Sequence, residues 1–170
     1  MSKFAGIGLF LLAASSAMAG QPSPHVGHQQ REIKALSAQQ AQDYLEGKGM
    51  GYARAAELNR YPGPAHTLEL ADRLGLTVEQ RDATARLAKA HHAEAKAIGL
   101  KRVESERAIE ALFRAGNANA AQLAAAVGHA AMLEGEYRLS HLETHRRLRA
   151  VLTDAQVRRY EELRGYAAKH

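Results

Sequence analysis

The longest regular pattern of apolar and polar positions runs from Thr77 to Leu152. Apolar and small residues recur there at intervals of three and four, the spacing that places them on one face of an α-helix. The one strong break is Gly116-Asn117-Ala118-Asn119. We therefore expect two long antiparallel helices joined by a tight turn, the first of them from Val78 to Ala115.

The seam between these two helices is predicted to be thin, because polar residues interrupt its heptad spacing. Its rows are Thr84, His91, Ile98, Ser105 and Leu112 with Ala88, Ala95, Arg102 and Ile109 on the first helix, and Leu123, Ala130, Tyr137, Thr144 and Val151 with Val127, Glu134, His141 and Leu148 on the second.

Two copies of the pattern Leu-Thr-x-x-Gln bracket the predicted hairpin. In each copy the Thr hydroxyl can accept a hydrogen bond from a first-turn backbone N–H, while the Gln side chain can reach back to the Thr N–H. Both copies therefore predict helix starts, and the second copy begins a final helix. The residues are Leu76, Thr77 and Gln80 in the first copy, and Leu152, Thr153 and Gln156 in the second.

Shorter elements are predicted ahead of the hairpin. Ser37 and Gln40 repeat the capping pattern and start a short helix, after which Gly47, Gly49 and Gly51 predict a flexible turn. Two more short helices are predicted, over 52–58 and over 66–74. Asn59 is expected to end the first of them in the left-handed conformation. Residues 20–35 carry Pro, Gln and His without apolar periodicity, and are predicted to be a disordered tail.

Composition supports an all-α fold. Hydrophobic residues make up 46% of the chain and aromatic residues only 5%, so the apolar content is mostly Ala and Leu, which suits helix packing. No sustained run of alternating β-branched and aromatic residues predicts a strand. We expect an elongated hairpin with short N-terminal helices and a C-terminal helix, which dimerises to bury more apolar surface.

The first residues have the three parts of a secretory signal. Lys3 is followed by the apolar stretch 4–14 and by Ala17-Met18-Ala19, so 1–19 is predicted to be cleaved and the protein to be periplasmic, with 36–170 as one domain. The chain has no Cys, which excludes disulfides and thiolate chemistry. Its basic residues lack interleaved aromatics, which argues against nucleic-acid binding despite a pI of 9.6.

Histidines supply the candidate chemistry. His141 and His145 lie one helical turn apart, so both imidazoles can reach one ion. Centring the turn at Gly116-Asn117 places His92, and nearly His91, opposite His141, with His66 as a further candidate ligand. Such a cluster favours zinc, copper, nickel or cobalt. In the alternative interpretation His91 and His141 fill gaps in a polar seam, while His92 and His145 face water.

Arginines crowd the end of the hairpin and the last helix. Their stems can cover apolar surface while the charged heads stay in water, which would suit the binding of unfolded or acidic client segments. A solvated, salt-bridged helix face is the more ordinary explanation. No hydrolase or nucleotide-binding motif is present, so we expect neither an enzyme nor a nucleotide cofactor. The candidate client-binding residues are Arg138, Arg146, Arg147, Arg149, Arg158 and Arg159.

The paired Leu-Thr-x-x-Gln copies around a helical hairpin, with the export signal and the absence of Cys, resemble the Spy/CpxP family of periplasmic proteins. The resemblance covers about Tyr61 to Tyr166 and extends to the heavy-metal members ZraP and CnrX. It implies a four-helix, hook-shaped protomer that forms a homodimer. It also implies a metal sensor or resistance factor, or else an ATP-independent chaperone or an adaptor for an inner-membrane sensor or anti-sigma partner.

Within that resemblance, His141 and His145 stand where the sensor members have a His and a Met one turn apart, and His66 lies near the place of an earlier His ligand. The implied ligand is therefore a divalent transition metal such as Zn, Cu, Ni or Co.

Overall fold

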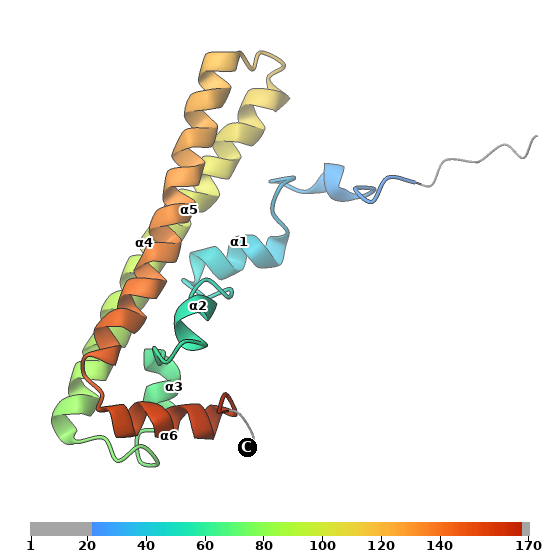
Figure 1. The fold of residues 1–170 in the computed structure, drawn as a ribbon. Coiled ribbons are helices and arrows are strands. Elements are labelled where there is room, and N and C mark those ends of the chain that lie inside the picture. Colours follow the sequence, from blue (N-terminus) through green and yellow to red (C-terminus); the bar gives the residue numbers. More distant parts are fainter. Residues whose placement is uncertain (1–21, 168–170) are drawn as a thin grey trace, which may run out of the picture.

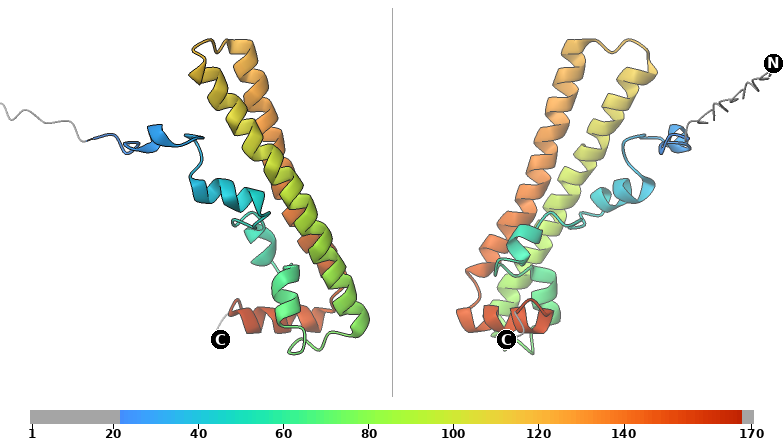
Figure 2. Two further views of the ribbon diagram at one scale, coloured as in Figure 1. Left: turned by 180° about the vertical axis from the view of Figure 1, so that it is seen from behind. Right: turned by 45° about the vertical axis from the view of Figure 1, so that its right-hand side comes forward.

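The computed structural model describes residues 22–167 and is helical throughout its regular elements (Figure 1). The predicted signal peptide, residues 1–19, lies outside the described residues. Two long helices form the predicted hairpin, and a last helix crosses its open end, giving the expected hook (Figure 2). The helices are α1 (Ala38–Leu45), α2 (Arg54–Glu57), α3 (Pro64–Glu69), α4 (Val78–Arg114), α5 (Ala120–Arg149) and α6 (Asp154–Arg164), after a 3-10 turn at His28–Gln30.

Helices α1 to α3 belong to an N-terminal arm, residues 32–74, which descends along the hairpin from its middle to its base (Figure 1). By its 37 residues, α4 is roughly 55 Å long. Across residues 22–167, no helix is both long and apolar enough to cross a membrane.

The two Leu-Thr-x-x-Gln copies meet at the base of the hook. Each forms the predicted capping box, at Thr77 with Gln80 and at Thr153 with Gln156. The two Gln side chains then pair with each other: the Gln80 amide donates to the Gln156 carbonyl oxygen at 2.9 Å, and the reverse bond is 2.8 Å. Gln80 also donates to the Val151 carbonyl at 2.9 Å. This reciprocal pair therefore fastens the start of α6 to the start of α4.

We expect Gln156→Leu to lower the free energy of unfolding by about 2 kcal/mol, because it removes the bond to the Thr153 N–H and leaves Gln80 without its partner. Gln40→Leu is the matched control. Gln40 makes the same bond to the Ser37 N–H in the capping box at the start of α1. Its substitution should lower the free energy of unfolding by only about 1 kcal/mol. Equal losses in urea denaturation would show that the pairing of the two glutamines adds no stability.

Two apolar clusters hold the arm and α6 on the hairpin. The one at the base joins α5 and α6 to the end of the arm, and the one at the middle joins the arm to both long helices. The base cluster contains Ala71, Leu74, Leu76, Leu148, Leu152, Val157 and Tyr160. The middle cluster contains Ile33, Leu36, Tyr44, Ala95, Val103 and Tyr137.

The middle cluster includes Ile33, which lies in the segment predicted to be a tail and is only 5% exposed. Next to it, Arg107 of α4 donates to Glu32 at 2.8 Å, and Lys34 pairs with Glu110. The last residues of that segment are therefore packed on α4.

A close approach of α1 to α4 is possible only because residue 99 is Gly. A Cβ atom built there would lie 1.9 Å from the carbonyl oxygen of Tyr44. Glycine therefore lets the backbones of α1 and α4 touch at this point.

A half-buried polar network also holds the arm. Tyr44 donates to Glu134 at 2.9 Å and shares a 2.7 Å hydrogen bond with Tyr52, which itself bonds Glu134. Arg102 completes the network with a 3.0 Å bond to the same carboxylate. Although burial alone would raise the pKa of Glu134, these donors hold it below its usual value. The network therefore contains a charged carboxylate with its hydrogen-bond sites occupied.

Two of the short helices differ from the sequence prediction. Helix α2 spans Arg54–Glu57, and the left-handed residue after it is Arg60 rather than Asn59, whose side chain instead donates to the Ala55 carbonyl at 2.8 Å. Helix α3 begins earlier than predicted, at Pro64, because proline is preorganised for a first helical position. It also ends earlier, at Glu69.

The far end of the hairpin is thin, as predicted. No residue from 106 to 129 is buried. The arm touches only the first part of this stretch, through the ion pairs of Glu32 with Arg107 and of Lys34 with Glu110. Val127, assigned to the seam, is 49% exposed, and Phe113 is 59% exposed.

Candidate functional site

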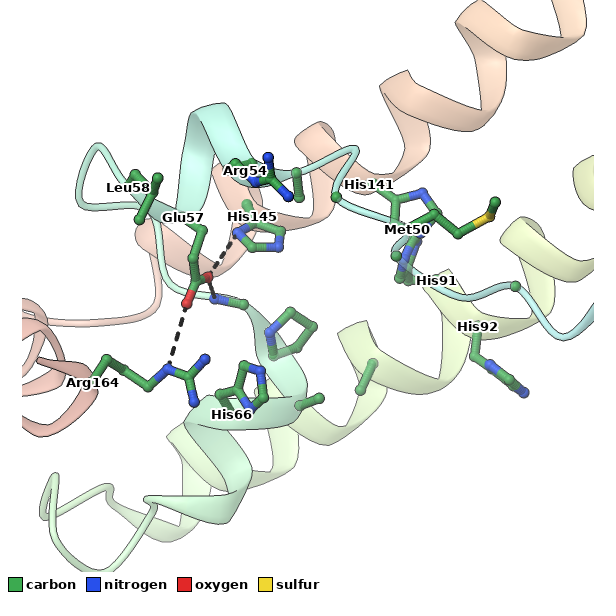
Figure 3. A pocket seen from close by; sticks show the side chains of 18 of the residues that line it. Met50, Arg54, Glu57, Leu58, His66, His91, His92, His141, His145 and Arg164 are labelled. Carbon is green, nitrogen blue, oxygen red and sulfur yellow. Dashed lines mark hydrogen bonds and ion pairs between the residues drawn. The ribbon is translucent and has the colours of Figure 1, made fainter. Parts of the chain in front are cut away.

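A cavity of about 580 Å³ lies between the arm and the hairpin. We call it the histidine pocket, because all five predicted histidine ligands line it (Figure 3). They are His66, His91, His92, His141 and His145, and the pocket is also lined by Met50, Arg54, Glu57 and Arg164.

His141 lies on the face of α5 that the arm covers, and is 4% exposed. Its Nδ1 lies 2.9 Å from the Tyr137 carbonyl oxygen. Since a carbonyl can only accept, Nδ1 carries the proton and Nε2 carries the lone pair. That Nε2 is buried and has no hydrogen-bond partner among the described residues. Burial lowers the pKa of His141, so its imidazole is neutral.

His91 faces His141 from α4. The two ring centroids are 4.4 Å apart and the rings are nearly perpendicular, at 84°. The Nδ1 of His91 is also buried and unpartnered within the described part of the chain. Burial, and then the nearby His141, lower the pKa of His91 to about 4. The pocket thus holds two neutral imidazoles side by side.

Counting from the turn placed His92 opposite His141 and His91 only nearly so, but in the structure His91 is the histidine of α4 that faces His141. His92 is exposed, and its side chain points away from the pair (Figure 3). It borders a separate shallow groove with Lys48 and Lys96. One residue along a helix is a rotation of about 100°, so only one of two consecutive histidines can face the partner helix.

His145 lies one turn from His141 but its ring belongs to another part of the pocket. Its Nδ1 is 2.7 Å from the Tyr61 carbonyl oxygen and 3.7 Å from Glu57. The side chain is 12% exposed, so it does not face water. A Cβ at residue 63 would lie 2.9 Å from the ring, and Gly63 therefore leaves room for the imidazole.

Glu57 is the anionic centre of that part of the pocket. It accepts from the Gly63 N–H at 3.1 Å and from Tyr160 at 2.5 Å, and Arg164 lies 3.8 Å away. His66, on α3, pairs with Glu69 at 2.8 Å, with a side chain 42% exposed. Glu57 thus has partners in the arm and in α6, beside His145 of α5.

The five histidines therefore share one cavity without converging on one point. No group of three or more His, Asp or Glu side chains in 22–167 is arranged to hold a metal ion. The predicted cluster of three or four imidazoles is reduced to the pair His91 and His141, with His145 one turn away.

Sequence reasoning missed Met50, Arg54 and Glu57, which come from the arm. Met50 lies in the run from Gly47 to Gly51, predicted to be a flexible turn, and Arg54 and Glu57 lie in the short helix predicted over 52–58. In the structure the run from Gly47 to Gly51 lines the pocket, and Tyr137 donates to the Lys48 carbonyl at 2.7 Å.

None of the six candidate client-binding arginines lines the histidine pocket. Arg146 pairs with Glu143, Arg149 with Asp154, and Arg159 with Glu162. Arg146 and Arg147 also border a shallow groove with Leu87 and Val151. Half of the set is therefore engaged in local ion pairs, as the salt-bridged alternative expects.

Comparison of the chain with protein-family models, with curated proteins and with solved structures gives no match. The interpretation of the site therefore depends on its own geometry and on the sequence patterns described above.

Proposed function

We propose that this protein binds a transition-metal ion in the histidine pocket and acts in the periplasm as a heavy-metal-response protein. The observation that carries the proposal is the pair His91 and His141. Their rings lie 4.4 Å apart, and one buried nitrogen of each, Nδ1 of His91 and Nε2 of His141, has no hydrogen-bond partner within 22–167. The export signal and the resemblance to periplasmic metal-response proteins support the proposed location and role.

The chemistry of the pair fits a metal ligand. Imidazole binds zinc, copper, nickel and cobalt through a neutral nitrogen, and burial keeps both rings neutral. Metal-binding histidines commonly donate their other N–H to a carbonyl, which fixes the tautomer, and His141 makes such a bond to Tyr137. His145 makes the same kind of bond to the Tyr61 carbonyl, which leaves the lone pair of its Nε2 free to bind an ion.

An ion in this pocket would also affect the packing of the arm. His91 comes from α4 and His141 from α5, while the loop around Gly49 supplies another wall, with a Cβ position 3.9 Å from the His141 ring. Binding would therefore link arm and hairpin, and a partner that contacts the arm could detect the bound ion. This is the physical basis we propose for a sensor or resistance role.

We expect the metal-free chain to bind zinc, copper, nickel or cobalt with micromolar or tighter affinity. In His91→Ala/His141→Ala the affinity should fall at least about thirtyfold, since both central ligands are lost. Isothermal titration calorimetry measures the difference, with circular dichroism to confirm that the variant is folded. The matched control is His129→Ala, which changes an exposed histidine in the first half of α5, and it should bind metal like the wild type.

Equal affinities of the double variant and the wild type would place binding elsewhere, such as at His25 and His28, whose rings lie 5.5 Å apart. If the wild type binds none of the four metals, the metal proposal is wrong. An ATP-independent chaperone or a signalling adaptor would then be the better interpretation.

A further inference from the structure

The histidine pocket is much larger than a bare metal ion needs. Its volume of about 580 Å³ is typical of cavities that hold small organic ligands. A zinc ion with imidazole nitrogens at about 2.1 Å would fill only a small part of it. The wall also supplies few metal ligands, because within 22–167 no three His, Asp or Glu side chains are arranged around one point. Zinc takes four ligands, and nickel and copper take at least four, so the others come from outside the chain.

The charged residues of the pocket favour an anion over a cation. Among the lining residues, Arg54 and Arg164 are positively charged and only Glu57 is negatively charged. Two positive charges therefore face one negative charge even when every imidazole is neutral. Such a wall repels a bare divalent cation and attracts a complex in which carboxylates have reversed the charge of the ion.

Both arginines are placed to bind an anion. Arg54 is exposed, has no ion-pair partner within 22–167, and its Nη2 lies 3.2 Å from the Cβ position of Gly51 in the pocket wall. Arg164 donates to the Tyr166 hydroxyl at 3.2 Å, and its buried Nε has no hydrogen-bond partner among the described residues. A guanidinium can bind a carboxylate through two parallel N–H···O bonds.

We propose that the pocket binds its metal ion as a complex with a small polycarboxylate. The carboxylates bind Arg54 and Arg164, while His91 and His141 complete the coordination of the metal. This inference rests on the proposed function, because it names the form in which the same pocket takes its ion. Figure 3 shows the His91 and His141 rings at one end of the view and Arg164 at the other, with Arg54 between them. A chelator would thus occupy the space that a bare ion leaves empty.

The test measures nickel binding by the full metal-free chain with and without citrate. If the chain took only the free ion, citrate would compete for nickel and weaken the apparent affinity by mass action. We expect the opposite, an apparent affinity at least about threefold tighter with citrate, because the arginines bind the complex. Equilibrium dialysis with radiolabelled citrate should retain nickel and citrate in equal amounts. Ethylenediamine is the control chelator, since its nickel complex is cationic and it should only weaken binding.

Arg54→Gln distinguishes binding of the complex from binding of the ion. It should weaken the binding of nickel citrate at least about tenfold and change the binding of nickel alone less than about twofold. Because Arg54 is exposed and has no ion-pair partner within 22–167, the variant should remain folded. Arg138→Gln is the matched control, because it changes an exposed arginine of α5 that does not line the pocket, and it should bind nickel citrate like the wild type.

The contrary outcomes are distinct. If citrate weakens nickel binding as ethylenediamine does, or if Arg54→Gln binds nickel citrate like the wild type, the inference is wrong. The proposed function then stands if nickel alone binds and is lost in His91→Ala/His141→Ala. If that double variant retains citrate as well as the wild type does, the pocket binds the carboxylate without the metal, and the inference is again wrong. If the wild type binds none of the four metals, with or without citrate, the proposed function itself fails.

Discussion

Gly99→Ala is expected to displace α1 from the hairpin and to lower the free energy of unfolding by about 3 kcal/mol. The added Cβ would lie 1.9 Å from the Tyr44 carbonyl oxygen and 2.6 Å from its carbonyl carbon. These are backbone atoms, which cannot rotate away as a side chain can. The helix must therefore shift, and the Tyr44 contacts with Glu134 and Tyr137 shift with it.

Urea denaturation would measure the loss of stability, and faster proteolysis between residues 32 and 53 would show that the arm has been displaced. Gly128→Ala is the matched control, because Gly128 is also in a long helix but no atom lies within 4 Å of its Cβ position. That change should stabilise the protein by about 0.5–1 kcal/mol, through the better helix propensity of alanine. If the two variants behave alike, the contact between α1 and α4 is not as described.

The hairpin and its caps could be predicted because their signals are local. Ser37, Thr77 and Thr153 each form the capping box that the sequence indicates, and the break at Gly116 becomes the turn. One property of these signals required the structure. The capping sequences do not reveal that Gln80 and Gln156 bond each other, because a contact between residues 76 positions apart leaves no local pattern.

The packing of the arm was the main part that the sequence could not provide. Gly99 and Val103 fall outside the predicted seam and are buried, because α1 covers a second face of α4. Glu134 was placed in the seam as an interruption. In the structure it accepts hydrogen bonds from Tyr44 and Tyr52 of the arm, which explains a charged residue at that position.

The candidate site was likewise predictable only in part from the sequence. The turn position was enough to bring a histidine of α4 opposite His141, because register in a short-looped hairpin follows from counting. The count was one residue off, because it favoured His92 over His91, and it could not show that His145 turns toward Glu57. Met50 was invisible for a similar reason, since its place in the pocket depends on how the arm folds back over the hairpin.

The metal-free protein should become less stable as the pH falls from about 7 to about 4.5, through the buried imidazole pair. In the unfolded chain His91 takes up a proton near its ordinary pKa of 6.5, whereas in the folded chain burial and His141 lower its pKa to about 4. Between these values the unfolded state binds more protons, so acid favours unfolding. The pKa of His141 is lowered too, and its contribution has the same sign.

For His91 alone the full shift would correspond to about 3.4 kcal/mol, and partial exposure to solvent reduces our expectation to about 2 kcal/mol. Urea denaturation at a series of pH values, with chelator present, would give the slope. His91→Gln should flatten it, while His129→Gln should leave it unchanged. The other titratable and charged groups of the pocket are present in both variants, so the difference in slope isolates His91. They are His66, His92, His145, Glu57, Arg54 and Arg164. Parallel slopes for the two variants would mean that His91 has the same pKa in the folded and the unfolded protein, and burial would then not lower it.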